Sequence, residues 1–89
     1  LEPLPPSALR RLLETVAARL GFGYRELYVW PTACQMANAA IIGAGLRRRI
    51  VVFTDLLLAR LADDEVAAVF AHEAAHAQRH HVTRYAAFG

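Results

Sequence analysis

Residues 27–46 contain no charged side chain, and this stretch limits the folds that are open to the chain. Its length would suffice for a helix across a lipid bilayer, which takes about 20 apolar residues. Pro31 and Asn38 interrupt the stretch, however, and make a poor membrane-spanning helix. Leu27–Trp30 is aromatic and β-branched and stops at the proline, and Ala37–Ile42 is a second apolar run. We therefore expect two β-strands here rather than one transmembrane helix.

A third strand and a first helix are expected on either side of these two strands. Arg49–Thr54 is rich in β-branched residues and follows a turn predicted at Gly43–Gly45, so it should close a hairpin with the second strand. Ser7 is a good N-cap for a helix that ends at Gly21. The apolar residues of that helix recur at helical spacing: Leu9, Leu12, Leu13, Val16, Ala17 and Leu20.

Two further helices are expected after the sheet. A short one over Asp55–Leu61 is capped by Thr54 or Asp55, and a longer one begins with the acidic residues Asp63–Glu65, where the helix dipole favours negative charge. The longer helix turns a set of apolar residues toward the sheet: Val66, Val69, Phe70, Ala74 and Ala77. The sequence thus predicts an α+β fold over residues 1–89, with an N-terminal helix and this longer helix packed on a small three-stranded sheet.

The size and charge of the chain suit a single small domain that does not bind nucleic acid. Its 89 residues support one modest core, and a net charge of +2 is weak, with no aromatic residues interleaved among the arginines. The one basic run, Arg47–Arg49, is most simply a solvated strand end, and binding of acidic lipid headgroups is the alternative. Cys34 is the single cysteine, which excludes an internal disulfide, and we expect it to be a buried, unreactive thiol.

The motif His72-Glu73-Ala74-Ala75-His76, of the form H-E-x-x-H, carries the clearest chemical signal in the chain. Residues four apart lie on one face of a helix, so the two imidazoles can bind one zinc ion. Glu73 projects about 100° round the helix from His72, which leaves it beside the metal and within reach of a zinc-bound water. This arrangement is typical of metallopeptidases. The alternative is a solvated helix that happens to carry two histidines.

A longer series of residues resembles a known family. The series, in order, is Asn38-Ala39, Gly43, Arg-Arg-Ile-Val-Val-Phe-Thr-Asp-Leu-Leu over 48–57, Asp-Glu-Val-Ala-Ala-Val over 64–69, and the histidine motif. In the order and spacing of these motifs it resembles the gluzincin family of integral-membrane endopeptidases, which includes the HtpX heat-shock protease and the CAAX prenyl protease. The similarity covers about residues 27–81 and is much more specific than the five-residue motif.

The resemblance implies a zinc metalloendopeptidase that hydrolyses peptide bonds of proteins, membrane proteins among them, with a water activated by zinc. His72 and His76 would bind the metal, and Glu73 would be the catalytic base. One strand would edge the cleft and pair with the backbone of an extended peptide substrate. That edge strand consists of Asn38, Ala39, Ala40, Ile41 and Ile42.

The chain departs from this family at the third zinc ligand, which the resemblance implies to be a glutamate on a later helix. Residues 77–89 contain no acidic side chain. Along an unbroken helix, His80 would lie about 12 Å from His72 and Glu65 about 10 Å back, so neither converges on the same ion. Val82 stands where metzincins carry their third histidine. We therefore expect the third ligand outside this chain, and the 89 residues alone should bind zinc weakly and hydrolyse nothing.

We interpret the chain as a soluble insert between transmembrane spans of a longer, multi-pass parent in the cell membrane. Arginines near both ends favour the cytoplasmic side: Arg10, Arg11, Arg79 and Arg84. Two other functions remain open. One is a non-catalytic module of degenerate zincin fold, whose strand edge docks a peptide or partner. The other is a binder of nucleic acid or lipid headgroups that works through Arg47–Arg49.

Overall fold

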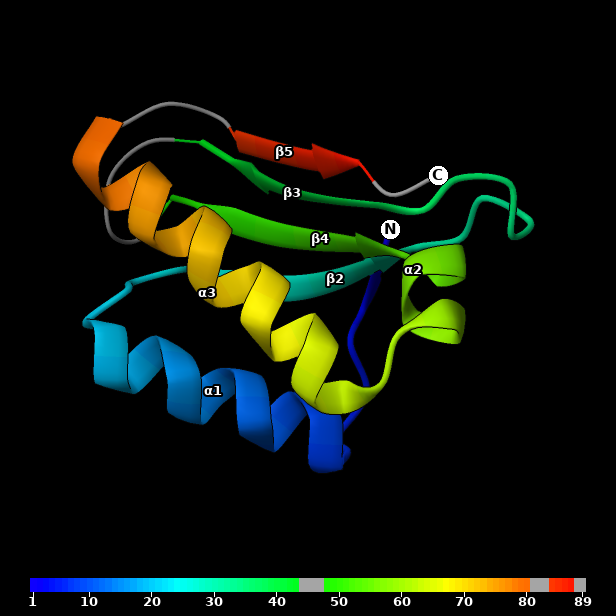
Figure 1. Cartoon of the computed structure of the whole chain (residues 1–89), viewed down its shortest axis with the longest axis horizontal. Helices are drawn as coiled ribbons and strands as arrows, with labels where there is room; N and C mark the ends of the chain where they lie inside the picture. Colours follow the sequence, from blue (N-terminus) through cyan, green and yellow to red (C-terminus); the bar gives the residue numbers. More distant parts are fainter. Residues whose placement is uncertain (44–47, 81–83, 88–89) are drawn as a thin grey trace.

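A mixed β-sheet with helices on one of its faces makes up the chain in the computed structural model (Figure 1). The structure describes residues 1–43, 48–80 and 84–87, and the side chains of all of these except 80 and 84–87. The elements in chain order are β1 (Glu2–Pro3), α1 (Ala8–Leu20), β2 (Glu26–Trp30), β3 (Asn38–Ile42), β4 (Ile50–Thr54), α2 (Asp55–Arg60), α3 (Asp63–His80) and β5 (Arg84–Ala87).

The sheet has the strand order β1-β2-β4-β3-β5 in the described part of the chain. β2 and β4 are parallel, and every other neighbouring pair is antiparallel. The α+β class is confirmed, and the three predicted strands are β2, β3 and β4, with the last two paired as the predicted hairpin. The prediction of three strands was too low, because β1 and β5 add a strand at each edge.

The two additional strands were missed for physical reasons. β1 is only two residues long and ends at a proline, so no alternating pattern marks it. The tyrosine and two alanines of β5 carry no strand signal stronger than that of a helix. In the described residues, no helix is both long and apolar enough to cross a membrane.

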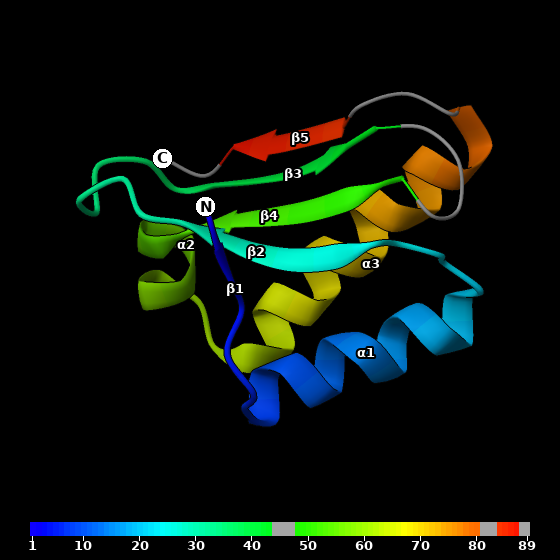
Figure 2. The ribbon, with the colours of Figure 1, turned by 180° about the vertical axis from the view of Figure 1, so that it is seen from behind.

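Alternation along the strands divides the sheet into two apolar faces. One face of the sheet packs against α1 and α3 and forms the hydrophobic core with them. It carries Leu27, Ala39, Ile41, Val51 and Phe53. The residues between them point the other way: Tyr28, Trp30, Ala40, Ile42 and Val52. Figure 2 views the molecule from that second side, with α3 behind the strands. The strands are therefore apolar on both faces, although the helices pack against one.

α1 begins and ends as its sequence predicts. The Ser7 hydroxyl accepts a hydrogen bond from the Arg10 amide (3.1 Å), and Gly21 ends the helix in the left-handed conformation with φ of 63°. Leu13 and Ala17 are buried, Leu9, Leu12 and Val16 pack against the margin of the core, and Leu20 is exposed. The buried stripe packs α1 against α3 (Figure 1).

α3 places the histidine motif next to the sheet. Its first turn carries Asp63, Asp64 and Glu65, as predicted. The residues that it buries are Val66, Ala67, Phe70, Glu73, Ala74 and Ala77. Phe70 meets the rings of Phe22 and Phe53 edge-on, with centroid separations of 5.6 and 6.4 Å. This aromatic contact fixes the height of α3 over the strands, and the small alanines let the helix approach β3 closely.

Arg49 corrects our interpretation of the basic run as solvated. Its side chain is only 5% exposed, and its guanidinium stacks 4.2 Å from the centroid of the Phe22 ring. Nε donates a hydrogen bond to the carbonyl of Gly23, and burial lowers the pKa of the guanidinium. Arg48 is exposed, whereas Arg47 and most of the predicted turn at Gly43–Gly45 lie outside the described residues. Arg49 thus ties β4 to the end of α1 and does not contribute to a binding surface.

Candidate active site

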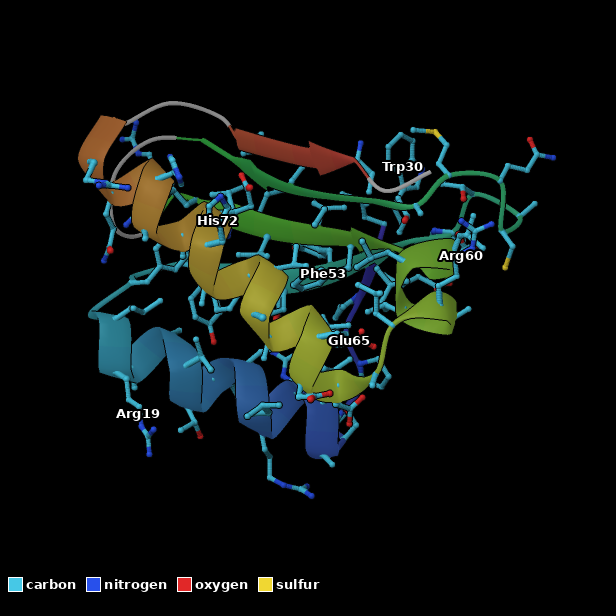
Figure 3. All side chains as sticks on the ribbon, in the orientation of Figure 1. Arg19, Trp30, Phe53, Arg60, Glu65 and His72 are labelled. Carbon is cyan, nitrogen blue, oxygen red and sulfur yellow. The ribbon has the colours of Figure 1, made fainter. Side chains whose placement is uncertain are left out.

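The two histidines of the motif lie side by side on α3. The centroids of the His72 and His76 rings are 4.6 Å apart, and the ring planes are tilted by 55°. His72 is exposed and His76 is half-buried, so a ligand can reach them from solvent. Figure 3 shows His72 on the stretch of α3 that passes β4. Zinc–nitrogen bonds of about 2.0–2.1 Å can bridge rings at this separation, so the pair fits two ligands of one metal ion.

Glu73 points in a different direction from the histidines that flank it. It is 5% exposed, on the side of α3 that packs toward the sheet. The difference follows from the rotation of about 100° per residue in a helix. A buried carboxylate thereby lies on the side of α3 that packs toward the strands, and the histidines on either side of it in the sequence point elsewhere.

The described residues do not supply a third ligand for the pair. No group of three or more His, Cys, Asp and Glu side chains that could hold a metal occurs in the described part of the chain. Glu65, considered from the sequence, lies two turns before His72 on the same helix, and Figure 3 shows the two residues well separated along α3. The side chain of His80 lies outside the described residues.

β3 is not an edge strand in this structure, which corrects the position we expected for it. Its outer side pairs with β5, antiparallel, with Asn38 opposite Ala87, Ala39 opposite Ala86, Ala40 opposite Tyr85 and Ile41 opposite Arg84. A free row of backbone groups readily pairs with any extended segment within reach, and the segment after α3 is close enough. α3 contacts both β3 and β5, so a strand in this position passes directly beside the motif helix.

Asn38, the first residue of β3, is held through the side chain of Thr54. The Thr54 hydroxyl accepts a hydrogen bond from the Asn38 amide (2.8 Å) and donates one to the Asn38 carbonyl (3.2 Å). The same hydroxyl caps α2 through the Leu57 amide (3.4 Å). Asn38 Oδ1 is buried and has no hydrogen-bond partner in the described part of the chain. An acceptor is therefore available at the beginning of the strand that the family resemblance assigns to substrate.

Asp55 fixes the loop that leads into β3, a feature that sequence reasoning missed. Its carboxylate accepts hydrogen bonds from the Thr32 hydroxyl (2.7 Å) and from the amides of Thr32 and Cys34 (3.0 Å each). Ala33 and Cys34 both adopt left-handed backbone conformations, with φ of 56° and 55°, which are unfavourable for residues other than glycine. These hydrogen bonds offset that cost. Cys34 is exposed, so the prediction of a buried thiol was wrong.

Replacing Asp55 with asparagine should weaken the fold in a pH-dependent manner. The hydrogen bond from the Thr32 side chain, followed by those from the backbone amides, lowers the pKa of Asp55 from 3.8 to about 2. A carboxylate whose pKa is lower in the folded state stabilises the fold above its unfolded pKa, and that contribution is lost as the pH falls toward 2. Thermal melts between pH 7 and pH 2 should show a lower melting temperature for Asp55→Asn at neutral pH. The two curves should converge at the acidic end, and a constant gap across this range would contradict the role of the charge.

Comparison with known proteins identifies relatives along nearly the whole chain. The family described as Peptidase family M48 matches residues 3–89. The CAAX prenyl protease 1 homologs of Oryza sativa subsp. japonica and Arabidopsis thaliana are each 35% identical, over 81 and 83 residues, or 89% and 91% of this chain. The CAAX prenyl protease 1 of Saccharomyces cerevisiae is 32% identical over 89 residues, or 97% of the chain. These matches cover 19%, 20% and 19% of the relatives, so the chain spans about a fifth of their length.

Proposed function

The chain belongs to peptidase family M48, and we propose that it is the metal-binding part of a zinc metalloendopeptidase. The observation that carries the proposal is the arrangement on α3. Two adjacent imidazoles face solvent, and a buried carboxylate sits between α3 and the sheet. Zinc is the metal that best suits neutral imidazole ligands with an open coordination position.

Each residue of the motif has a separate role in the proposed reaction. His72 and His76 bind the metal. Zinc, when bound, supplies Lewis acidity that polarises the scissile carbonyl and lowers the pKa of water. Glu73 takes a proton from the attacking water and returns it to the leaving amine. Its position on α3 between the two histidines, on a buried side of the helix, supports this role, because a general base has to lie close to the water that it deprotonates.

The substrate in this proposal is a peptide or protein segment bound in extended form along β3. Two observations support this mode of binding. β5 shows that the outer side of β3 can pair with an antiparallel strand, and α3 contacts a strand in that position. Asn38 Oδ1 adds a buried acceptor for a substrate donor. Because β5 covers the same backbone groups, a substrate strand has to displace it.

Two further features of the proposed enzyme, the third zinc ligand and the membrane anchor, concern the longer parent protein. We propose that a glutamate elsewhere in the parent completes the zinc site, since the described residues provide two histidines. The relatives are named as CAAX prenyl proteases, and a membrane-embedded parent with this domain on the cytoplasmic side would suit them. The exposed Arg11 and Arg79 lie near opposite ends of the chain and agree with that orientation.

Zinc titration of the 89-residue chain tests the metal-binding pair. We expect weak binding, because two imidazoles leave at least one protein ligand missing. His72→Ala and His76→Ala should each lower the affinity at least tenfold. Glu65→Gln is the matched control, since it removes a potential ligand from the same helix, and it should leave the affinity unchanged.

A melt of the same chain with a chelator separates metal binding from folding. The core around Phe70 and Ala74 contains no metal ligand, so the melting temperature should not depend on zinc. Unfolding by the chelator, or zinc affinity that survives both histidine substitutions, would show that a different set of residues binds the metal.

A further inference from the structure

A small cavity opens on the sheet face that points away from α1 and α3. Its volume is about 100 Å³, and it lies where β2, β4 and β3 run side by side. Most of its wall is apolar. The lining residues are Trp30, Ala39, Ala40, Ile42 and Val52, with Asn38 and Thr54 at the end where β3 begins.

The cavity exists because a small residue separates larger ones. Ala40 lies opposite Val52 on β4, and its methyl group leaves a hollow between the larger side chains on this face. Trp30 and Ile42 form the rim and are 46% and 39% exposed, which is high for side chains of this size. An apolar group that entered the hollow would therefore remove both of these exposed surfaces from water.

The register of β5 shows which position of a bound strand meets this hollow. Ala40 is opposite position 85, and in an antiparallel pair directly opposed residues point to the same face of the sheet. We propose that the hollow is a substrate subsite that accepts an apolar side chain from the residue opposite Ala40. The proposal rests on the proposed function, since it needs a substrate strand paired with β3.

The walls select for an aliphatic or aromatic side chain over a charged one. None of the described lining residues is charged, so an acidic or basic side chain would lose hydration without gaining an ion pair. A cavity of about 150 Å³ binds benzene, which indicates that about 100 Å³ suits one aliphatic side chain. Thr54 is already engaged, because its hydroxyl binds the backbone of Asn38.

The subsite lies on the opposite face of the substrate strand from the chemistry. Neighbouring residues of an extended strand point alternately to the two sides of the sheet. The residues on either side of the one that enters the hollow therefore face α3, where Glu73 and the histidine pair lie. Side-chain selection and bond cleavage thus act on different residues of the substrate.

The test uses the intact 89-residue chain and short peptides with the sequence of residues 83–87. The peptide residue that corresponds to position 85 is varied among leucine, phenylalanine, glycine and aspartate, and binding is followed by amide chemical shifts of β3. We expect the leucine or phenylalanine peptide to bind about tenfold more tightly than the aspartate peptide, with glycine between them. Trp30→Ala should reduce this preference severalfold, whereas Met36→Ala should not. Met36 is a matched control because it is 45% exposed and does not line the cavity.

The possible outcomes distinguish the subsite from the proposed function. If all four peptides bind with equal affinity, or if Trp30→Ala leaves the preference for apolar residues unchanged, the subsite is wrong. Docking of a strand on β3 would still stand. Failure of every peptide to reach β3, also in an Ala86→Pro chain that weakens the competing β5 pairing, would count against strand docking itself, and with it against the subsite. Since β5 competes for the same edge, the chain also provides an internal test. Replacing position 85 with leucine should protect the β3 amides from hydrogen exchange more than replacing it with glycine, and equal protection would contradict the subsite.

Discussion

Replacing Glu73 with glutamine in the full-length parent should reduce peptide hydrolysis by at least a hundredfold and leave zinc binding intact. A positioned general base contributes about 10²–10⁴-fold to such a reaction, and the amide cannot accept the proton. Glu73 is not expected among the ligands, because it leaves α3 in a different direction from the two histidines. Glutamine has nearly the same shape, so the packing between α3 and the sheet should persist.

The measurement pairs peptidase activity with zinc content in the same preparation. Glu65→Gln is the control on the same helix, since Glu65 is exposed and two turns distant, and it should retain full activity. A zinc-loaded Glu73→Gln parent that keeps a tenth or more of the activity would remove Glu73 from the role of base. Loss of zinc together with activity would place Glu73 among the ligands instead.

The elements that local chemistry defines were predictable from sequence. Ser7, Gly21 and Thr54 act as helix caps in the structure, because a cap depends on residues within one turn of it. The three central strands follow from three apolar runs separated by turn residues, and the antiparallel pairing of β3 with β4 follows from the turn expected between them. The positions of His72 and His76 on one face follow from the helical repeat alone.

The features that were missed all depend on partners distant in the sequence. Asp55 binds a loop 21 to 23 residues earlier, and nothing in its local sequence identifies that partner. Arg49 looks like part of a charged run, yet it is buried because the ring of Phe22 and the carbonyl of Gly23 receive it. β5 pairs with β3 across more than forty residues of chain, and its composition gives no signal strong enough to predict a strand.

Replacing Phe70 with alanine should cost about 3–5 kcal/mol of the free energy of unfolding, the largest effect on stability that we expect from one substitution. The side chain is 1% exposed, and it contacts Phe22 after α1 and Phe53 in β4. Removing it leaves a cavity where α3 meets the sheet, and the rigid strands can close it only in part. A domain of this size has a total stability of roughly 4–13 kcal/mol, so the loss is a large share of the whole.

Thermal melts should show a fall of more than about 10 °C for Phe70→Ala, since 1 kcal/mol corresponds to about 4–8 °C in a domain of 60–100 residues. Phe70→Leu should lose much less, because leucine refills most of the volume, and Leu20→Ala at the 36% exposed end of α1 should change little. The variant should also bind zinc less tightly, because Phe70 holds the helix that presents His72 and His76. A melting temperature equal to that of the Leu20 control would mean that other contacts hold α3 on the sheet. The motif would then owe its position to the alanine face of α3 rather than to the aromatic contact.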